Sequence, residues 1–381
     1  MNRRDAIKLI GAGAAVLAAG GASWAFLNKE TETETKEEKK MKTIFDSTEL
    51  GAVKLKNRIW RSATWTAQSE DGHINDRLVD TYRTLAHGGV GAIITGLTSI
   101  SPYDADLNGG VKFCDDSDIA GHRRLTDAVH QEGAAVYLQT AMVDSFIKGF
   151  REGEGVQVDI DRLTLDNIRT IIGYFGDAAG RAERAGYDGV QIHAAHFFFL
   201  SMFISPAVNH RTDEYGGSPE KRAKILVDIL KDMRSKTSDG FSIIVKINAV
   251  DYMQGGLTVP DFITACKMLE EAGIDAIEVS ANGTSVPGVK PFKDEAYFLE
   301  YAEELKKNVD VPVILVGGHR SVANMERVLN STEIEYLSLS RPLIREPDLV
   351  NRWRRGDVHP ALCVSCNNCY RTEGHQCVFN R

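Results

Sequence analysis

Short apolar runs alternate with amphipathic segments along most of the chain. Runs that are apolar almost throughout are typical of parallel strands covered on both faces. We therefore expect strands at Ile59–Thr64, Gly91–Thr95, Ala135–Gln139, Gly189–His193, Ile243–Ile247, Ala276–Ser280, Val313–Val316 and Tyr336–Ser340.

Segments with a helical period lie between these runs, among them Asp76–Ala86, Leu165–Ala185 and Pro219–Met233. Several end at a glycine just before the next strand, as at Gly133 and Gly186, because glycine accepts the left-handed conformation that stops a helix. Eight strand–helix units in order predict an α/β fold, one TIM-type (β/α)8 barrel. The main rival is an open doubly wound sheet, but no G-x-G-x-x-G motif follows the first strand.

Two histidines stand where the fourth predicted strand ends. His193 closes that strand and His196 follows three residues later, so both can face the mouth of the barrel, where active sites of this fold lie. Two imidazoles there can donate hydrogen bonds to one substrate oxygen. Taken alone, H-x-x-H also fits two packed histidines or half of a zinc site, for which no third ligand is evident.

The segment DGVQIHAAHFFFLSMFISPAVNHRTDEYGGSPEKR resembles the Old Yellow Enzyme family of NAD(P)H:flavin oxidoreductases, and the resemblance runs from about Lys42 to the C-terminus. It implies FMN at the barrel mouth and a substrate oxygen held by His193 and His196. The implied flavin contacts are Ala63 and Thr64 against the ring, Gln139 and Lys246 at its pyrimidine edge, and Gly317, Gly318, Ser340 and Arg341 at the phosphate.

These assignments also make chemical sense by themselves. Reduced FMN is an anion, so the Lys246 cation beside it favours reduction. The glycines at 317 and 318 allow backbone N–H groups to approach a phosphate, and a helix starting near Ser321 adds its positive end. Arg341 can bind phosphate oxygens in a bidentate way.

The chain departs from the family at Phe198. Many ene-reductases of the family have a proton-donating tyrosine two residues after the second histidine, and phenylalanine has no exchangeable proton. Tyr103 and Tyr252 are candidate replacements, with water as a further source of the proton. The neighbouring aromatic residues either make the mouth more apolar or pack beneath a loop.

The second departure is a C-terminal group of cysteines. Cys363, Cys366, Cys369 and Cys377 form C-x-x-C-x-x-C-x7-C, and four thiolates so close can hold an iron–sulfur cluster or a zinc ion. Larger relatives of the family carry a [4Fe–4S] cluster after the barrel, with three residues in the second gap. Disulfides or free thiols remain the alternative.

The N-terminal residues differ from the rest of the chain. Residues 1–25 combine Arg3, Arg4 and a Gly/Ala-rich apolar run, which resembles a twin-arginine export signal or a membrane anchor. Residues 26–42 form a charged linker that we expect to be disordered. The barrel should then occupy residues 43–360 and a cysteine-rich tail 361–381. These features predict an exported, periplasmic or membrane-anchored protein, with a cytoplasmic location as the alternative.

These features favour an FMN-dependent oxidoreductase that passes hydride to an enone, a nitro compound or a similar electron-poor small molecule. The reductant is NAD(P)H or, outside the cytoplasm, a donor protein or quinone. Alternatives are an oxidative dehydrogenase or demethylase of the same fold, a non-flavin barrel enzyme and a non-catalytic FMN electron-transfer module. A net charge of −8 with scattered basic residues argues against nucleic acid as a partner.

Overall fold

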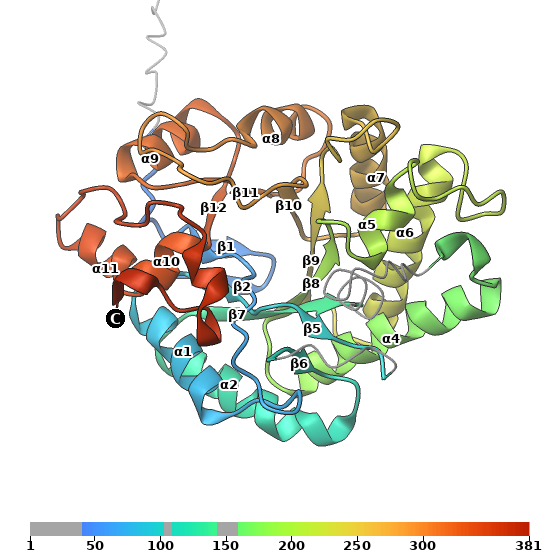
Figure 1. Cartoon of the computed structure of the whole chain (residues 1–381), viewed down its shortest axis with the longest axis horizontal. Helices are drawn as coiled ribbons and strands as arrows, with labels where there is room; N and C mark the ends of the chain where they lie inside the picture. The colour runs from blue at the N-terminus through green and yellow to red at the C-terminus, as the bar shows by residue number, and fades with distance from the viewer. Residues whose placement is uncertain (1–39, 103–108, 143–158, 381) are drawn as a thin grey trace, which may run out of the picture. The chain divides into compact units, whose positions relative to one another are not determined.

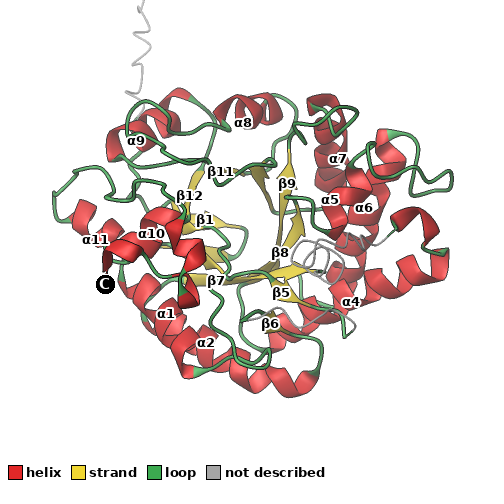
Figure 2. Ribbon diagram, in the orientation of Figure 1, coloured by secondary structure: helices red, strands yellow, loops and turns green. Residues whose placement is uncertain are grey.

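The computed structural model describes residues 40–102, 109–142 and 159–380. Parallel strands form a closed ring with helices outside it (Figures 1 and 2). In chain order the ring contains β3 (Ile59–Arg61), β4 (Ala92–Ile94), β7 (Ala135–Ala141), β8 (Gly189–Ala194), β9 (Ser242–Asn248), β10 (Ala276–Ser280), β11 (Val313–Val316) and β12 (Tyr336–Leu339). The ring closes because β12 pairs with β3, placing Leu337 opposite Ile59.

The TIM-type (β/α)8 prediction is therefore confirmed, and the open doubly wound sheet is excluded. Each of the eight predicted strand runs overlaps one barrel strand, although β3 ends at Arg61 rather than at Thr64 and β7 continues to Ala141. Two short strands, β5 (Thr98–Ser99) and β6 (Val111–Lys112), extend the sheet beside β7.

The helices that cover the ring begin and end at recognisable signals. α4 starts at a capping box in which Thr164 and Asn167 bond each other, and Gly186 follows its end with φ +84°. The helices are α1 (Asp76–His87), α2 (Ile119–Gln131), α4 (Leu165–Arg184), α5 (Phe199–Ile204), α6 (Pro219–Ser235), α7 (Val259–Glu271), α8 (Leu299–Lys306), α9 (Val322–Ser331), α10 (Arg341–Arg345) and α11 (Leu349–Arg354).

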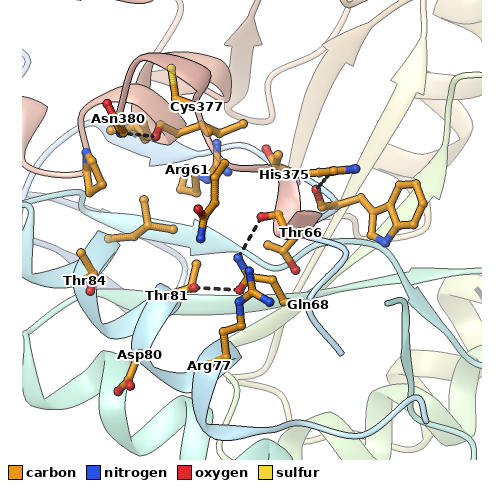
Figure 3. A pocket seen from close by; sticks show the side chains of 18 residues that line it. Arg61, Thr66, Gln68, Arg77, Asp80, Thr81, Thr84, His375, Cys377 and Asn380 are labelled. Atoms are coloured by element: carbon orange, nitrogen blue, oxygen red, sulfur yellow. Dashed lines mark hydrogen bonds between the residues drawn. The ribbon is translucent and has the colours of Figure 1, made fainter. Parts of the chain in front are cut away.

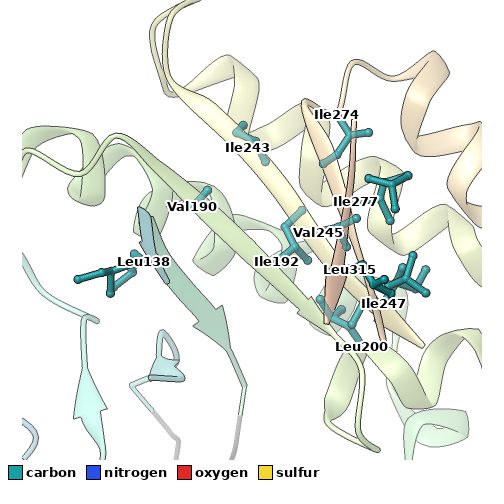
Figure 4. Close-up of a cluster of buried hydrophobic side chains, with 14 of the residues drawn as sticks. Leu138, Val190, Ile192, Leu200, Ile243, Val245, Ile247, Ile274, Ile277 and Leu315 are labelled. Carbon is teal, nitrogen blue, oxygen red and sulfur yellow. The ribbon is translucent and has the colours of Figure 1, made fainter. Parts of the chain in front are cut away.

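Alternate side chains of each strand face the helices or the barrel interior, because the side-chain period of a strand is two. Val190 and Ile192 of β8, and Ile243 and Val245 of β9, belong to the outer core between the strands and the helices (Figure 4). Gln191 lies between the first two and Ile244 between the second two, and both side chains face the barrel interior.

An apolar floor fills the N-terminal end of the barrel. The hairpin of β1 (Thr48–Leu50) and β2 (Val53–Leu55) packs with interior residues such as Trp60 and Tyr137 in one buried cluster. The polar side chains of the barrel interior described below lie toward the opposite, C-terminal end of the strands.

The C-terminal tail returns to the loop that follows β3. It contains the short turns η3 (Asn368–Arg371), η4 (Glu373–His375) and η5 (Val378–Asn380). Gln68 Nε2 donates to the carbonyl of Gly374 at 3.0 Å, and His375 Nδ1 lies 2.8 Å from the carbonyl of Trp65. The tail is thus held against the loop after the first barrel strand.

The chain divides into two units, Met1–Lys40 and Met41–Arg381. The predicted export signal, all but the last three residues of the predicted linker, and Tyr103 lie outside the described residues. Within the described ranges, no helix has the length and apolar content that a membrane crossing requires.

Candidate active site

A layer of polar side chains lies above the apolar floor. On β7, β9 and β10 the interior residue two positions beyond a floor residue is polar: Gln139 follows Tyr137, Lys246 follows Ile244 and Glu278 follows Ala276. Strand register brings them to one level, because Lys246 lies opposite Glu278. Side chains that point inward from parallel strands stack in such layers.

Hydrogen bonds link this layer into a chain. Gln139 Nε2 donates to Gln191 Oε1 at 2.9 Å, and Gln191 Nε2 donates to Glu278 Oε2 at 2.7 Å. Ser62 Oγ donates to the other carboxylate oxygen of Glu278 at 2.9 Å. The predicted flavin ligand Gln139 is therefore oriented by the buried glutamate through Gln191.

Lys246 is paired within the same layer. Its Nζ lies 3.3 Å from Glu278 Oε1 and 2.9 Å from Ser62 Oγ. Lys246 is 3% exposed and Glu278 is fully buried. A buried cation persists when a counter-charge and hydrogen bonds compensate its lost hydration, and Glu278 supplies that charge.

Sequence reasoning identified Gln139 and Lys246 but missed Gln191, Glu278 and Ser62. The sequence did contain one indication of the buried glutamate. Glu278 interrupts the otherwise apolar run AIEVS, and a charged residue is unusual in a strand that is covered on both faces.

The structure brings the two predicted histidines together. The rings of His193 and His196 have centroids 5.2 Å apart and an interplanar angle of 77°. Burial, and then the nearby Lys246 charge, lowers the pKa of His193 to about 3. Burial, and then the nearby His193 and Lys246 charges, lowers the pKa of His196 well below its ordinary value. Both rings are therefore neutral near pH 7, each with one N–H donor.

The two histidines differ in their partners. His196 Nε2 lies 2.8 Å from Ser280 Oγ, and the backbone N–H of His196 donates to Asn248 Oδ1 at 3.1 Å. Nδ1 of His193 is buried and has no hydrogen-bond partner among the described residues.

The turn that holds the histidines is strained. His196 has φ +63° and Phe197 has φ +60°, a left-handed conformation that costs a non-glycine residue free energy and often marks functional sites. The Phe198 ring then packs on His193, with centroids 4.6 Å apart. Tyr252, a predicted substitute proton donor, is 62% exposed, and its hydroxyl lies 3.2 Å from that of Tyr301. It is therefore engaged with α8 rather than with the histidines.

Thr64 and Ala63 follow β3 at the barrel mouth, as predicted. Thr64 Oγ1 donates to the carbonyl of Ser62 at 2.9 Å and lies 2.8 Å from Ser340 Oγ. Ala63 packs partly buried against the apolar floor cluster. A side-chain hydrogen bond thus joins the segments that follow the first and last barrel strands, beside the predicted position of the flavin ring.

The glycine turn after β11 has no room for side chains. Gly317 and Gly318 have φ +135° and +77°, and a Cβ on Gly318 would lie 2.8 Å from the ring of Tyr297. Ser340 and Arg341 follow the neighbouring strand β12, which pairs with β11. Arg341 Nη1 donates to the carbonyl of Val286 at 2.9 Å and to the side chain of Asn367.

A carboxylate lies beside one part of the predicted phosphate site. Glu295 accepts from the backbone N–H groups of Arg320 (2.8 Å) and Ser321 (3.1 Å), just before α9 begins. A negative charge there interacts favourably with the positive end of the helix. Glu295 would therefore compete with a phosphate for the end of α9, but among the described residues it forms no hydrogen bond with the glycine turn or Arg341.

This arrangement fits FMN at the barrel mouth. The bare glycine turn permits close approach of a phosphate, and Gln139 and Lys246 offer amide and ammonium groups to a polar ring edge.

All four cysteines of the tail line one small cavity. None of the six cysteines is joined in a disulfide. Among the described residues, no set of three or more histidine, cysteine, aspartate or glutamate side chains could hold a metal ion.

Comparisons with known proteins agree with this geometry. The model of the NADH:flavin oxidoreductase / NADH oxidase family matches residues 43–358. An NADH oxidase of Thermoanaerobacter brockii is 31% identical over 342 residues, covering 85% of this chain and 52% of that protein. A metal reductase of Desulforamulus reducens is 28% identical, covering 89% of this chain and 54% of that protein.

The chain spans about half the length of these two relatives. A 4,4'-dithiodibutanoate disulfide reductase of Rhodococcus erythropolis is 27% identical and is covered over 94% of its length. An Old Yellow Enzyme homologue of Zymomonas mobilis superimposes with a TM-score of 0.70 at 25% identity, over 85% of this chain and 96% of that one. The chain therefore belongs to the NADH:flavin oxidoreductase / NADH oxidase family of FMN-linked oxidoreductases.

Proposed function

We propose that the protein reduces an electron-poor small molecule, such as an enone or a nitro compound, whose oxygen lies between His193 and His196. The observation that carries this proposal is the pair of neutral histidine rings that lie together where β8 ends. Neutral N–H donors aimed at an oxygen stabilise the negative charge that develops there during reduction. FMN, when bound, supplies the hydride.

The residues below the histidines hold the flavin and balance its charge. Gln139 binds its pyrimidine edge, and Lys246 provides a positive charge there. Because Glu278 already neutralises much of that charge, the site holds an uncharged oxidised ring without leaving a free cation in the barrel.

The proton that completes the reduction cannot come from Phe198. Tyr252 is engaged with Tyr301. Tyr103, the other tyrosine candidate, lies outside the described residues. We propose water at the barrel mouth as the source of the proton, with Tyr103 as the alternative.

The histidine assignment is tested with the double variant His193→Ala/His196→Ala. We expect full FMN content and at least a hundredfold loss of kcat/KM with 2-cyclohexenone or nitrobenzene, as for removal of oxyanion donors. If a phenol binds at the mouth of the wild-type protein and changes its flavin absorbance, the double variant should lose that change. The exposed His87→Ala serves as the control.

Turnover or phenol binding that survives in the double variant would contradict the assignment. Oxidation of amines or alcohols by the wild-type protein, without reduction of either acceptor, would favour the oxidative alternative instead.

We further propose that Cys363, Cys366, Cys369 and Cys377 hold an iron–sulfur cluster through which a donor protein or quinone delivers electrons, with NAD(P)H as the alternative reductant. The shared cavity supports this proposal. So does Arg320, which is 1% exposed and has Nη2 4.0 Å from Cys363 Sγ. A guanidinium so placed stabilises the negative charge of metal-bound thiolates.

Iron and acid-labile sulfide should be present in stoichiometric amounts after anaerobic purification. Cys369→Ser should lose both while retaining FMN, whereas Cys266→Ser, in the core beside α6 and α8, should retain both. Iron-free wild-type protein with full FMN would exclude the cluster.

We also propose export through residues 1–25, which the pair Arg3–Arg4 indicates. Replacing both arginines by lysine should retain the protein in the cytoplasm. An unchanged distribution after cell fractionation would contradict the export assignment.

A further inference from the structure

A second cavity lies between the barrel and the C-terminal tail, outside the layer of the histidines and Lys246. Its volume is about 600 Å³, within the range of small-molecule sites. The walls come from the loop after β3, from helix α1, from α10 and from residues 374–380 of the tail (Figure 3). Segments more than 300 positions apart in the sequence therefore enclose it, as the bond from Gln68 to Gly374 shows with a separation of 306.

Arg61 is a buried cation that lines this cavity. It is 4% exposed, and its Nη1 donates to the carbonyl of Ser340. Burial lowers the pKa of Arg61 to about 10, so the side chain stays charged at neutral pH. No carboxylate of the described residues forms an ion pair with it. Buried charges are normally paired, so the cavity offers the place for a missing anion.

A second guanidinium faces the cavity from the helix side. Arg77 of α1 packs on Gly374, where a Cβ would lie 2.3 Å from its Nη2. Its ion pair with Glu373 is long, at 3.3 Å, and Glu373 is 90% exposed, so the pair contributes little. Figure 3 shows Arg61 on the side of the tail and Arg77 on the side of α1. The lining carboxylate Asp80 pairs with Arg83.

The remaining wall is partly apolar. Trp65, Leu343 and Ile344 contribute ring and aliphatic surface to the same cavity. A ligand that fits both the cationic wall and the apolar wall has an anionic oxygen group attached to an apolar body.

We propose that this cavity binds a small organic carboxylate, with the carboxylate between Arg61 and Arg77 and the apolar part against Leu343 and Ile344. The ligand contacts both α1 and the tail, and Cys377 lines this cavity as well as the cavity of the four cysteines. Occupancy therefore holds the tail against the barrel. The proposal is independent of the reaction at the barrel mouth.

Calorimetric titration of the FMN-loaded protein with benzoate tests this site. Arg61→Met should weaken benzoate binding at least about tenfold, because a buried charge-assisted bond is lost. Arg77→Gln should weaken it about threefold, because that side chain is partly exposed. Arg83→Gln, on the same helix with similar exposure, should bind as the wild type does.

Two further titrations locate the site. The His193→Ala/His196→Ala variant should keep its benzoate affinity, which distinguishes this cavity from the barrel mouth. Inorganic phosphate, which lacks an apolar body, should bind at least about tenfold more weakly than benzoate. The proposal is overturned if benzoate does not bind, if Arg77→Gln and Arg61→Met bind it like wild type, if the histidine variant loses it, or if phosphate binds as tightly.

Discussion

The polar layer around Lys246 and the region beneath the C-terminal tail both bury positive charge, but only the polar layer balances it internally. Lys246 has Glu278 at 3.3 Å within one hydrogen-bonded layer. Arg61 and Arg320 instead donate to carbonyls, a hydroxyl and a thiol, and no described carboxylate forms an ion pair with either.

The two regions therefore differ in how far their charge balance depends on a bound group. The polar layer of the barrel needs no ligand to balance its cation, because Lys246 has Glu278 as a counter-charge in the same barrel. The tail region carries guanidinium groups whose counter-charge must come from cysteine thiolates or from a bound anion. The polar layer is therefore charge-balanced in the unliganded protein, whereas the tail region reaches charge balance only when it binds an anion or when its cysteines ionise.

The largest effect should follow from breaking the balance at the mouth. Glu278→Gln keeps the shape and most hydrogen bonds of the side chain but removes the charge beside Lys246. We expect a loss of about 3–5 kcal/mol in the free energy of unfolding, as for a buried pair that loses one partner. Urea titration at saturating FMN measures it, with the exposed Glu303→Gln as control. A loss below about 1 kcal/mol would show that the pair is not the main support of Lys246.

The glycine turn should give the next largest effect. Gly318→Ala introduces a Cβ at φ +77° and 2.8 Å from Tyr297, so we expect a loss of about 2–3 kcal/mol and weaker FMN binding. Gly273→Ala is the matched control, because it has φ +89° with no atom within 4 Å. It should cost only about 1 kcal/mol. Equal losses would mean that crowding by Tyr297 does not matter.

Acid should destabilise the mouth through His193. The pKa of His193 falls from 6.5 to about 3 on folding, so the unfolded chain gains a proton that the folded chain does not as the pH drops below 6.5. Stability is therefore lost between about pH 6.5 and pH 3. In His193→Asn the melting temperature should fall less steeply over this range, while His87→Asn should follow the wild type. An identical slope in His193→Asn would contradict the neutral state of this ring.

The smallest effect should come from Arg61→Met without added carboxylate. Replacing an unpaired buried cation by an apolar side chain of similar length removes one hydrogen bond and relieves a desolvation penalty. We expect a change within about 1 kcal/mol in urea unfolding, in contrast to Glu278→Gln. A loss of several kcal/mol would mean that Arg61 already has a counter-charge in the folded protein.

Much of the fold was predictable, because each barrel strand is a local apolar run and each helix has local signals such as the capping box at Thr164. Of the barrel-mouth residues, His193 was indicated by its place at the end of such a run, whereas Gln139 and Lys246 were indicated by the family resemblance. The partners of these residues were not. Ser62 and Glu278 are 216 positions apart, and nothing in either local segment specifies their hydrogen bond.

Local patterns in the chain are enough to predict the order of strands and helices, because each element depends on neighbouring residues. The same patterns place polar side chains at the strand ends and show the spacing of the four C-terminal cysteines. Only the tertiary structure decided that Glu278 balances Lys246, that Glu295 occupies the N-terminus of α9 and that Arg61 and Arg77 face one cavity. Each of these depends on closing the barrel and folding the tail back, which brings distant charges to distances where Coulomb energy and desolvation decide their state.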